Sequence, residues 1–138
     1  MNNNDNNNNN GHGRDNIEIL VVEDNMINLL LLKTLLLKKN YNIITATNGQ
    51  EAIELLANAT PDIILMDINM PVMNGYEASI AIRNSEARIN SIPIIAVTAE
   101  LHPDTRNKCI EAGMNGYVPK PIDMEELVET IKKFVKNI

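Results

Sequence analysis

Short apolar runs rich in β-branched residues alternate along this chain with longer segments of helical length and spacing. Five runs have the length and composition of strands: Ile17–Val22, Tyr41–Thr47, Asp62–Met66, Ile92–Val97 and Gly116–Val118. Five segments between and after them favour helices: Asn25–Lys39, Gln50–Ala59, Tyr76–Arg83, Asp104–Ala112 and a last one running from Asp123 to the chain end. This alternation predicts an α/β fold with a parallel sheet.

The strand candidates are continuous apolar runs, which is typical of strands buried on both faces. Right-handed crossovers leave few topologies for such a chain. Because only five strands are available, we expect the flavodoxin-like order 2-1-3-4-5 of a doubly wound sheet, and not a Rossmann order. The chain has 138 residues with 3% aromatic, so one domain with an aliphatic core is expected. Asp123 and Glu126 have the spacing of a capping box at the start of the last helix.

The first residues differ in composition from the rest of the chain. Residues 1–15 are an Asn-rich tract with two glycines, which has little apolar surface to bury and is predicted to be a disordered leader or linker. A docking or aggregation element is the less favoured reading. The folded domain is expected over 16–138, with no output domain after Ile138.

Composition excludes several function classes. A net charge of −6 with scattered lysines is not typical of nucleic-acid binding. The single Cys109 rules out an internal disulfide, and His12 and His102 have no metal spacing. The Leu29–Leu37 stretch is too short to span a bilayer and no secretory signal precedes it. We therefore expect a soluble cytoplasmic protein without membrane contact.

Polar residues interrupt or follow the strands at their carboxyl ends. Glu23 and Asp24 follow the first strand, Asp67 the third, Thr98 the fourth and Lys120 the fifth. These ends share one edge of a doubly wound sheet, and the order 2-1-3-4-5 opens a crevice between strands one and three. The three carboxylates are therefore expected to meet there.

Carboxylates gathered in one crevice repel one another, by roughly 4 kcal/mol per pair at about 4 Å and an effective dielectric near 20. A hard divalent cation such as Mg²⁺ offsets this repulsion, and Lys120 adds a fixed positive charge. A metal and a lysine around one carboxylate are what phosphoryl transfer requires. Each residue also has an ordinary reading: a loop residue, a cap, a solvated lysine or, for Tyr117, edge packing. Their convergence on one edge favours a site.

Four ordered motifs resemble the receiver domains of two-component response regulators, most closely those attached to hybrid sensor histidine kinases. They are Ile19–Asn25, Leu65–Gly75, Pro93–Ala99 and Gly116–Pro121. The resemblance covers the chain from about Asn16 to its end and implies a CheY-like fold. It implies a signalling domain that catalyses only its own phosphorylation and dephosphorylation within a phosphorelay.

The resemblance also implies a role for each residue of the motifs. Asp67 would be the phosphoacceptor. Mg²⁺ would be bound by Asp24, Asp67 and the Asn69 carbonyl, with Glu23 acting through water. Thr98 and Lys120 would contact phosphoryl oxygens, Tyr117 would be the aromatic switch, and Lys120–Pro121 would be cis.

The residues at two further positions imply kinetics and partners. Asn69 and Glu100 resemble the pair in a chemotaxis regulator that loses its phosphate quickly, so a short-lived acyl phosphate is expected. The implied partners are a histidine kinase or a histidine phosphotransfer protein, with the chain itself a monomer. It would be either a stand-alone regulator or the receiver of a hybrid kinase.

Three other functions have less support in the sequence. An aspartate phosphatase of the haloacid dehalogenase type needs an acid at the position of Asn69, which cannot shuttle a proton. A nucleotide-binding fold needs a glycine-rich loop where this chain has Glu23, Asp24 and Asn25. A receiver-like module that no longer takes phosphate would lack the acceptor or the lysine, and both are present.

Overall fold

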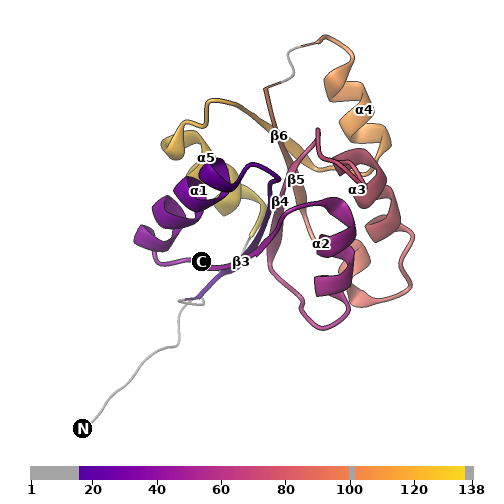
Figure 1. The fold of residues 1–138 in the computed structure, drawn as a ribbon, viewed down its shortest axis with the longest axis horizontal. Coiled ribbons are helices and arrows are strands. Elements are labelled where there is room, and N and C mark those ends of the chain that lie inside the picture. The colour runs from indigo at the N-terminus through magenta and orange to yellow at the C-terminus, as the bar shows by residue number, and fades with distance from the viewer. Residues whose placement is uncertain (1–15, 100–101, 136–138) are drawn as a thin grey trace, which may run out of the picture.

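The computed structural model describes residues 16–99 and 102–135, so the predicted leader at 1–15 lies outside the described part. A five-stranded parallel sheet in the order β3-β2-β4-β5-β6 forms its centre. The strands are β2 (Glu18–Val22), β3 (Asn42–Ala46), β4 (Ile63–Asp67), β5 (Ile94–Thr98) and β6 (Gly116–Pro119). Since β2 is the first strand along the chain, this is the order 2-1-3-4-5, and the predicted topology is confirmed (Figure 1).

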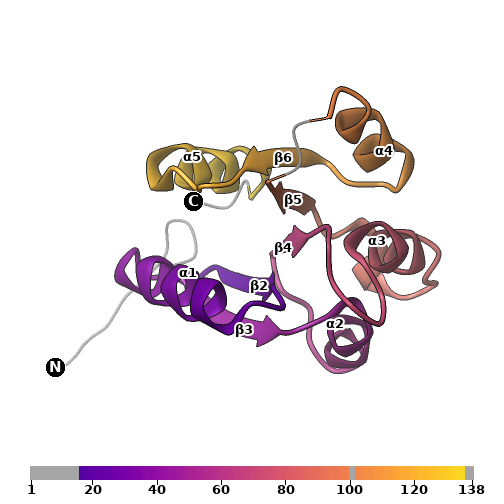
Figure 2. The same cartoon turned by 45° about the horizontal axis from the view of Figure 1, so that its top comes forward.

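Helices cover both faces of the sheet (Figure 2). They are α1 (Met26–Lys38), α2 (Gly49–Leu56), α3 (Gly75–Arg83), α4 (Thr105–Glu111) and α5 (Met124–Phe134). A short 3-10 helix, η2 (Arg88–Ser91), which the sequence analysis did not predict, precedes β5. Among the described residues no helix combines the length and the apolar character needed to cross a bilayer.

Alternate residues of the central strands supply two separate hydrophobic clusters. On β4, Ile64 and Met66 belong to the cluster that includes apolar residues of α2, α3 and α4. Ile63 and Leu65 belong to the other, which includes residues of α1 and α5. Every residue of β4 and β5 is buried, whereas the edge strands β3 and β6 are only partly buried. Continuous apolar runs are therefore confirmed for the central strands, whose two faces are both covered.

Side-chain caps fix where several helices begin. Asn25, Asn48 and Asn74 each accept a hydrogen bond from a backbone N–H in the first turn of α1, α2 and α3. A full capping box forms at Asn74 and Glu77. At α5, the Asp123 side chain accepts hydrogen bonds from the backbone N–H groups of Glu125 and Glu126. The Glu126 side chain does not bond back to the Asp123 backbone, so only the first half of the predicted capping box forms.

Two helices end earlier than their apolar patterns predict. α2 ends at Leu56 and not at Ala59, because Ala57 and Asn58 turn toward β4 through bonds to Glu54 and Leu55. α5 ends at Phe134 with Val135 extended, so the predicted continuation to the chain end is wrong. Neither change affects the carboxyl edge of the sheet, where the polar residues gather.

Candidate functional site

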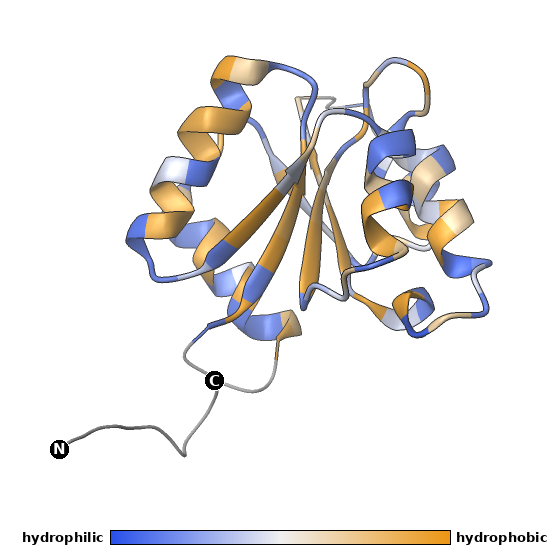
Figure 3. Ribbon diagram, turned by 60° about the horizontal axis from the view of Figure 1, so that its bottom comes forward, coloured by the Kyte–Doolittle hydropathy of each residue, from blue (hydrophilic) through white to orange (hydrophobic). Residues whose placement is uncertain are grey.

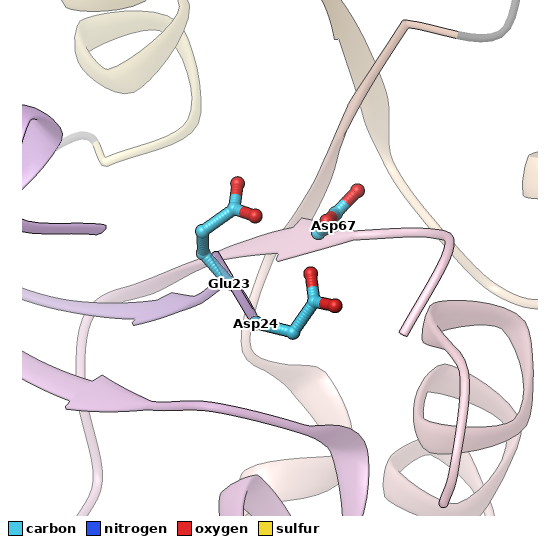
Figure 4. Close-up of side chains that lie close together, drawn as sticks. All are labelled: Glu23, Asp24 and Asp67. Carbon is cyan, nitrogen blue, oxygen red and sulfur yellow. The ribbon is translucent and has the colours of Figure 1, made fainter. Parts of the chain in front are cut away.

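Neighbouring parallel strands bring three carboxylates together at the carboxyl edge of the sheet. β2 and β4 pair with Val22 opposite Met66, so Glu23 and Asp24 lie beside Asp67. One carboxylate oxygen from each residue lies within 4.8 Å of the other two. Figure 4 shows all three side chains above the ends of these strands. The predicted convergence is therefore observed.

Lys120, which follows the edge strand β6, completes the cluster. β5 pairs with β6 so that Thr98 lies opposite Pro119, and the Lys120 N–H donates to the Thr98 carbonyl at 2.9 Å. The Lys120 ammonium then lies 2.9 Å from Glu23 Oε1 and 3.5 Å from Asp67 Oδ2. The backbone of Lys120 is thus anchored to the end of β5, the strand next to β4, and its side chain is directed at the acidic crevice.

Burial and like charges act together on Asp67. The residue is only 6% exposed and Glu23 is 5% exposed. Desolvation, followed by the charge of Glu23, raises the pKa of Asp67 to about 6, against the opposing effect of Lys120. A carboxyl with so high a pKa lies in an environment that disfavours its charge until further positive charge arrives.

Glu23 is the nearer partner of the lysine. Burial alone would lower the pKa of Lys120, but its hydrogen bond to Glu23 and the charges of Asp67 and Glu23 raise it above the ordinary value. The second oxygen of Glu23, Oε2, accepts from the backbone N–H of Asn25 at 3.2 Å. Both oxygens of Glu23 therefore have donors, whereas Asp67 is more weakly compensated.

The donor set of this crevice fits a hard divalent cation. Three carboxylates offer oxygen atoms of the kind that Mg²⁺ prefers, and Asp24 is exposed, which leaves an approach from solvent. Burial and the charge of Glu23 raise the pKa of Asp67, so a cation in the crevice would favour its ionised form. Asn69, two residues past Asp67, is exposed in the following loop.

The remaining predicted residues lie on β5, on β6 and beyond them. Thr98 is fully buried at the end of β5. Tyr117 is partly buried on β6, opposite Ala96, and lines a cavity of about 570 Å³ between α4 and α5. Glu100, the second residue predicted to tune dephosphorylation, lies outside the described residues. The Lys120–Pro121 peptide bond is cis, as expected.

The loop after Asp67 contains features that sequence reasoning missed. Gly75 begins α3 close against the backbone of Asp67, because a Cβ there would collide with the Asp67 carbonyl oxygen. The sequence gives no sign of this close approach between Gly75 and Asp67. Val72 has φ of 70° and closes a three-residue turn in which the Met73 N–H donates to the Pro71 carbonyl at 2.7 Å. A β-branched residue in this region is a strained conformation.

Comparison with known proteins identifies the family. A family model of the response regulator receiver domain matches residues 19–132. Among curated proteins, hybrid signal transduction histidine kinase M of Dictyostelium discoideum is 42% identical over 123 residues, covering 86% of this chain and 5% of that kinase. The chain therefore spans about one-twentieth of the length of this relative.

Two solved structures share the fold at moderate identity. One is the receiver domain of sensor histidine kinase PA1611 from Pseudomonas aeruginosa PAO1, with a magnesium ion coordinated in its active site cleft. Its TM-score is 0.80 at 36% identity, covering 87% of this chain and 98% of that one. The other is a co-crystal of the Saccharomyces cerevisiae histidine phosphotransfer protein Ypd1 with the receiver domain of Ssk1. Its TM-score is 0.78 at 31% identity, covering 88% and 90%.

Proposed function

The chain belongs to the response regulator receiver domain family, and from that premise we propose that Asp67 accepts a phosphoryl group from a phosphohistidine of a partner protein. One observation supports this most directly. Three carboxylates share a crevice with the ammonium of Lys120, which lies 3.5 Å from Asp67. This arrangement supplies a nucleophile and the charges that stabilise a transferring phosphoryl group.

In the proposed reaction an ionised oxygen of Asp67 attacks the phosphorus of the donor. The new O–P bond forms as the P–N bond to the imidazole breaks, and the imidazole nitrogen keeps the bonding electron pair. A pKa of about 6 leaves most of the Asp67 carboxyl ionised at neutral pH. Burial lowers the competition from water around the attacking oxygen.

The other residues of the crevice hold charge and position. Asp24, Asp67 and the Asn69 carbonyl would hold Mg²⁺, with Glu23 acting through water, and the bound ion would supply positive charge to the phosphoryl oxygens. Lys120 neutralises a further phosphoryl oxygen, turning from Glu23 toward the new group. Thr98 donates its hydroxyl to the phosphoryl group, and the accompanying movement of Tyr117 alters the surface formed by α4, β6 and α5.

The partners and the lifetime of the phosphorylated form belong to the same proposal. The receiver takes its phosphoryl group from a histidine kinase or histidine phosphotransfer protein, or passes it to one. Folded over residues 16–138, it acts either as a stand-alone regulator or as part of a hybrid kinase. Asn69 and Glu100 favour rapid hydrolysis, so an acyl phosphate that lasts for hours in Mg²⁺ would contradict this part.

Labelling with acetyl phosphate tests the assignment of Asp67. The unmodified chain is expected to gain one phosphoryl group by intact mass in Mg²⁺, and Asp67→Asn is expected to gain none. Asp104→Asn serves as the matched control, because Asp104 is exposed directly before α4, is not part of the carboxylate cluster and makes no side-chain cap. Full labelling of Asp67→Asn would refute the assignment.

A further inference from the structure

The amino terminus of α2 lies against the loop that joins β4 to α3. Gly49, the first residue of α2, donates its backbone N–H to the carbonyl of Met73 in this loop at 3.0 Å. Backbone N–H groups at the start of a helix have no acceptor within the helix. The side chain of Asn48 caps α2 through the N–H of Glu51, so the N–H of Gly49 is available to the loop. One hydrogen bond therefore joins α2 to the segment that follows Asp67.

The approach of the loop to α2 is so close that only glycine fits at position 49. A Cβ added to Gly49 would lie 2.6 Å from the Met73 carbonyl oxygen, 2.9 Å from the Met73 Cγ and 3.0 Å from the Ala78 Cβ. The Met73 side chain can turn away, but its carbonyl moves only with the backbone. Any side chain at Gly49 therefore pushes the loop away from α2.

Much of this loop has little apolar packing to hold it in place. Asn69, Pro71 and Val72 are exposed. Figure 3 shows hydrophobic colouring along the central strands and hydrophilic colouring in much of the chain that connects them to the helices. The position of the exposed part of the loop therefore depends on its hydrogen bonds to other segments.

Both polar groups of the Met73 backbone are used. Its N–H donates to the Pro71 carbonyl at 2.7 Å, and its carbonyl accepts from Gly49. Val72, between Pro71 and Met73, has a φ of 70°, which a β-branched residue rarely adopts. Such a conformation persists only where the surrounding structure fixes it. The bond from Gly49 is the contact that fixes this turn from outside the loop.

The loop held in this way contains Asn69. The Gly75 N–H donates to the Ile68 carbonyl at 2.9 Å and closes the loop at its base, so Asn69 lies between this closure and the contact with α2. In the proposed function the Asn69 carbonyl would hold Mg²⁺, an ion that requires nearly ideal ligand positions. Groups that position a ligand without touching the metal typically change its affinity by about 10- to 100-fold.

We propose that Gly49 is a positioning residue of the metal site, which holds the loop carrying Asn69 through its N–H and through the absence of a side chain. This inference rests on the proposed function, since it requires that the crevice binds Mg²⁺. Coupling between two events is reciprocal. If the bond from Gly49 to Met73 favours Mg²⁺ binding, bound Mg²⁺ must strengthen that bond.

The first test measures the Kd of Mg²⁺ by titration calorimetry on folded protein. Gly49→Ala is expected to raise the Kd at least about tenfold. The matched control is Gly116→Ala, which adds the same methyl group at 3.0 Å from the Ile95 Cδ1 at the amino end of β6, and it is expected to change the Kd by less than about twofold. Equal values of Kd in the two variants would overturn the inference.

The second test uses the unmodified chain and so does not depend on how Gly49→Ala folds. Amide hydrogen exchange is followed by NMR with and without Mg²⁺ for Gly49 and for Ala52, whose N–H donates to the Asn48 carbonyl and not to the loop. Mg²⁺ is expected to slow exchange at Gly49 at least about fivefold more than at Ala52. Slowing of both amides by the same factor would overturn the inference while leaving the metal site intact. A chain that shows no heat of Mg²⁺ binding would instead refute the metal site of the proposed function, and the role of Gly49 with it.

Discussion

Replacing Asp67 by Asn is expected to stabilise the metal-free protein at neutral pH. The substitution keeps the size of the side chain and removes one of three carboxylates that lie within 4.8 Å of one another. Lys120 retains Glu23 as a partner at 2.9 Å, so no buried charge loses its only counter-ion. The perturbation therefore removes mainly the unfavourable charge of Asp67.

The magnitude follows from the pKa of this carboxyl. Burial and the neighbouring charge of Glu23 raise it from 3.8 to about 6 in the folded protein. A difference of about two pKa units corresponds to about 3 kcal/mol, because each unit is about 1.4 kcal/mol. Well below the ordinary value of 3.8 the carboxyl is protonated in both the folded and the unfolded state, and no penalty arises.

The pH dependence has a definite sign. As pH rises from about 4 to 6, the unfolded chain releases this proton while the folded one retains it, so the wild type loses stability. Asp67→Asn has no such proton, and the difference between the two proteins isolates this effect from that of the other carboxyls. The variant should exceed the wild type by about 3 kcal/mol at pH 7 and by only about 0.5 kcal/mol at pH 4.

Urea unfolding in EDTA at several pH values measures this difference. Addition of Mg²⁺ at about a hundred times its Kd should stabilise the wild type by about 2.7 kcal/mol and the variant by much less. A stability difference that is independent of pH between 4 and 7 would refute the electrostatic reasoning. Equal stabilisation of both proteins by Mg²⁺ would show that Asp67 is not a ligand of the metal.

Three further substitutions test the surroundings of Asp67. Gly75→Ala should lower the free energy of unfolding by about 2 kcal/mol, since the new Cβ meets the Asp67 backbone. Gly116→Ala is the control and should lower it by less in the same urea assay, because its Cβ meets the flexible end of Ile95 at 3.0 Å. Val72→Asn should raise the free energy of unfolding by about 1 kcal/mol and so raise the melting temperature. Asn tolerates positive φ, and Val72 is 80% exposed, so its side chain makes little contact that would be lost. Lys120→Met should destabilise by about 2 kcal/mol at pH 7, since Glu23 then stays buried without its ion pair, and a loss below 0.5 kcal/mol would show that the pair is not needed.

The topology could be predicted because the apolar runs, the helical segments between them and the number of strands all indicated the same fold. Continuous apolar runs set the buried strands, and the number of strands limited the order. Once the order was set, the carboxyl-end positions of Glu23, Asp24, Asp67 and Lys120 required them to converge. The helix ends were less predictable, since the apolar pattern of Gln50–Ala59 continues past Leu56, where local hydrogen bonds end α2.

What the sequence did not reveal depends on distances between segments far apart in the chain. Lys120 was expected to face Asp67, yet its nearer partner is Glu23, 97 positions away along the chain. The exposure of α1 was also hidden, because a leucine-rich segment predicts burial on every side until the tertiary arrangement shows one side uncovered. The strain at Val72 is likewise a property of the folded loop and not of its composition.

The charges of the crevice connect metal binding, acceptor chemistry and switching in the proposed function. Three carboxylates and one ammonium leave a net charge of −2 when Asp67 is ionised, which one Mg²⁺ balances. Phosphorylation replaces the single negative charge of Asp67 by a group carrying about −1.5 to −2. The crevice with its Mg²⁺ then has an excess of up to one negative charge. The nearest means of compensation are the ammonium of Lys120, released from Glu23, and hydrogen-bond donors at the end of β5, where Thr98 is fully buried. Because β5 pairs with β6, which carries Tyr117, the proposed function would transmit this demand for donors to the surface between α4 and α5.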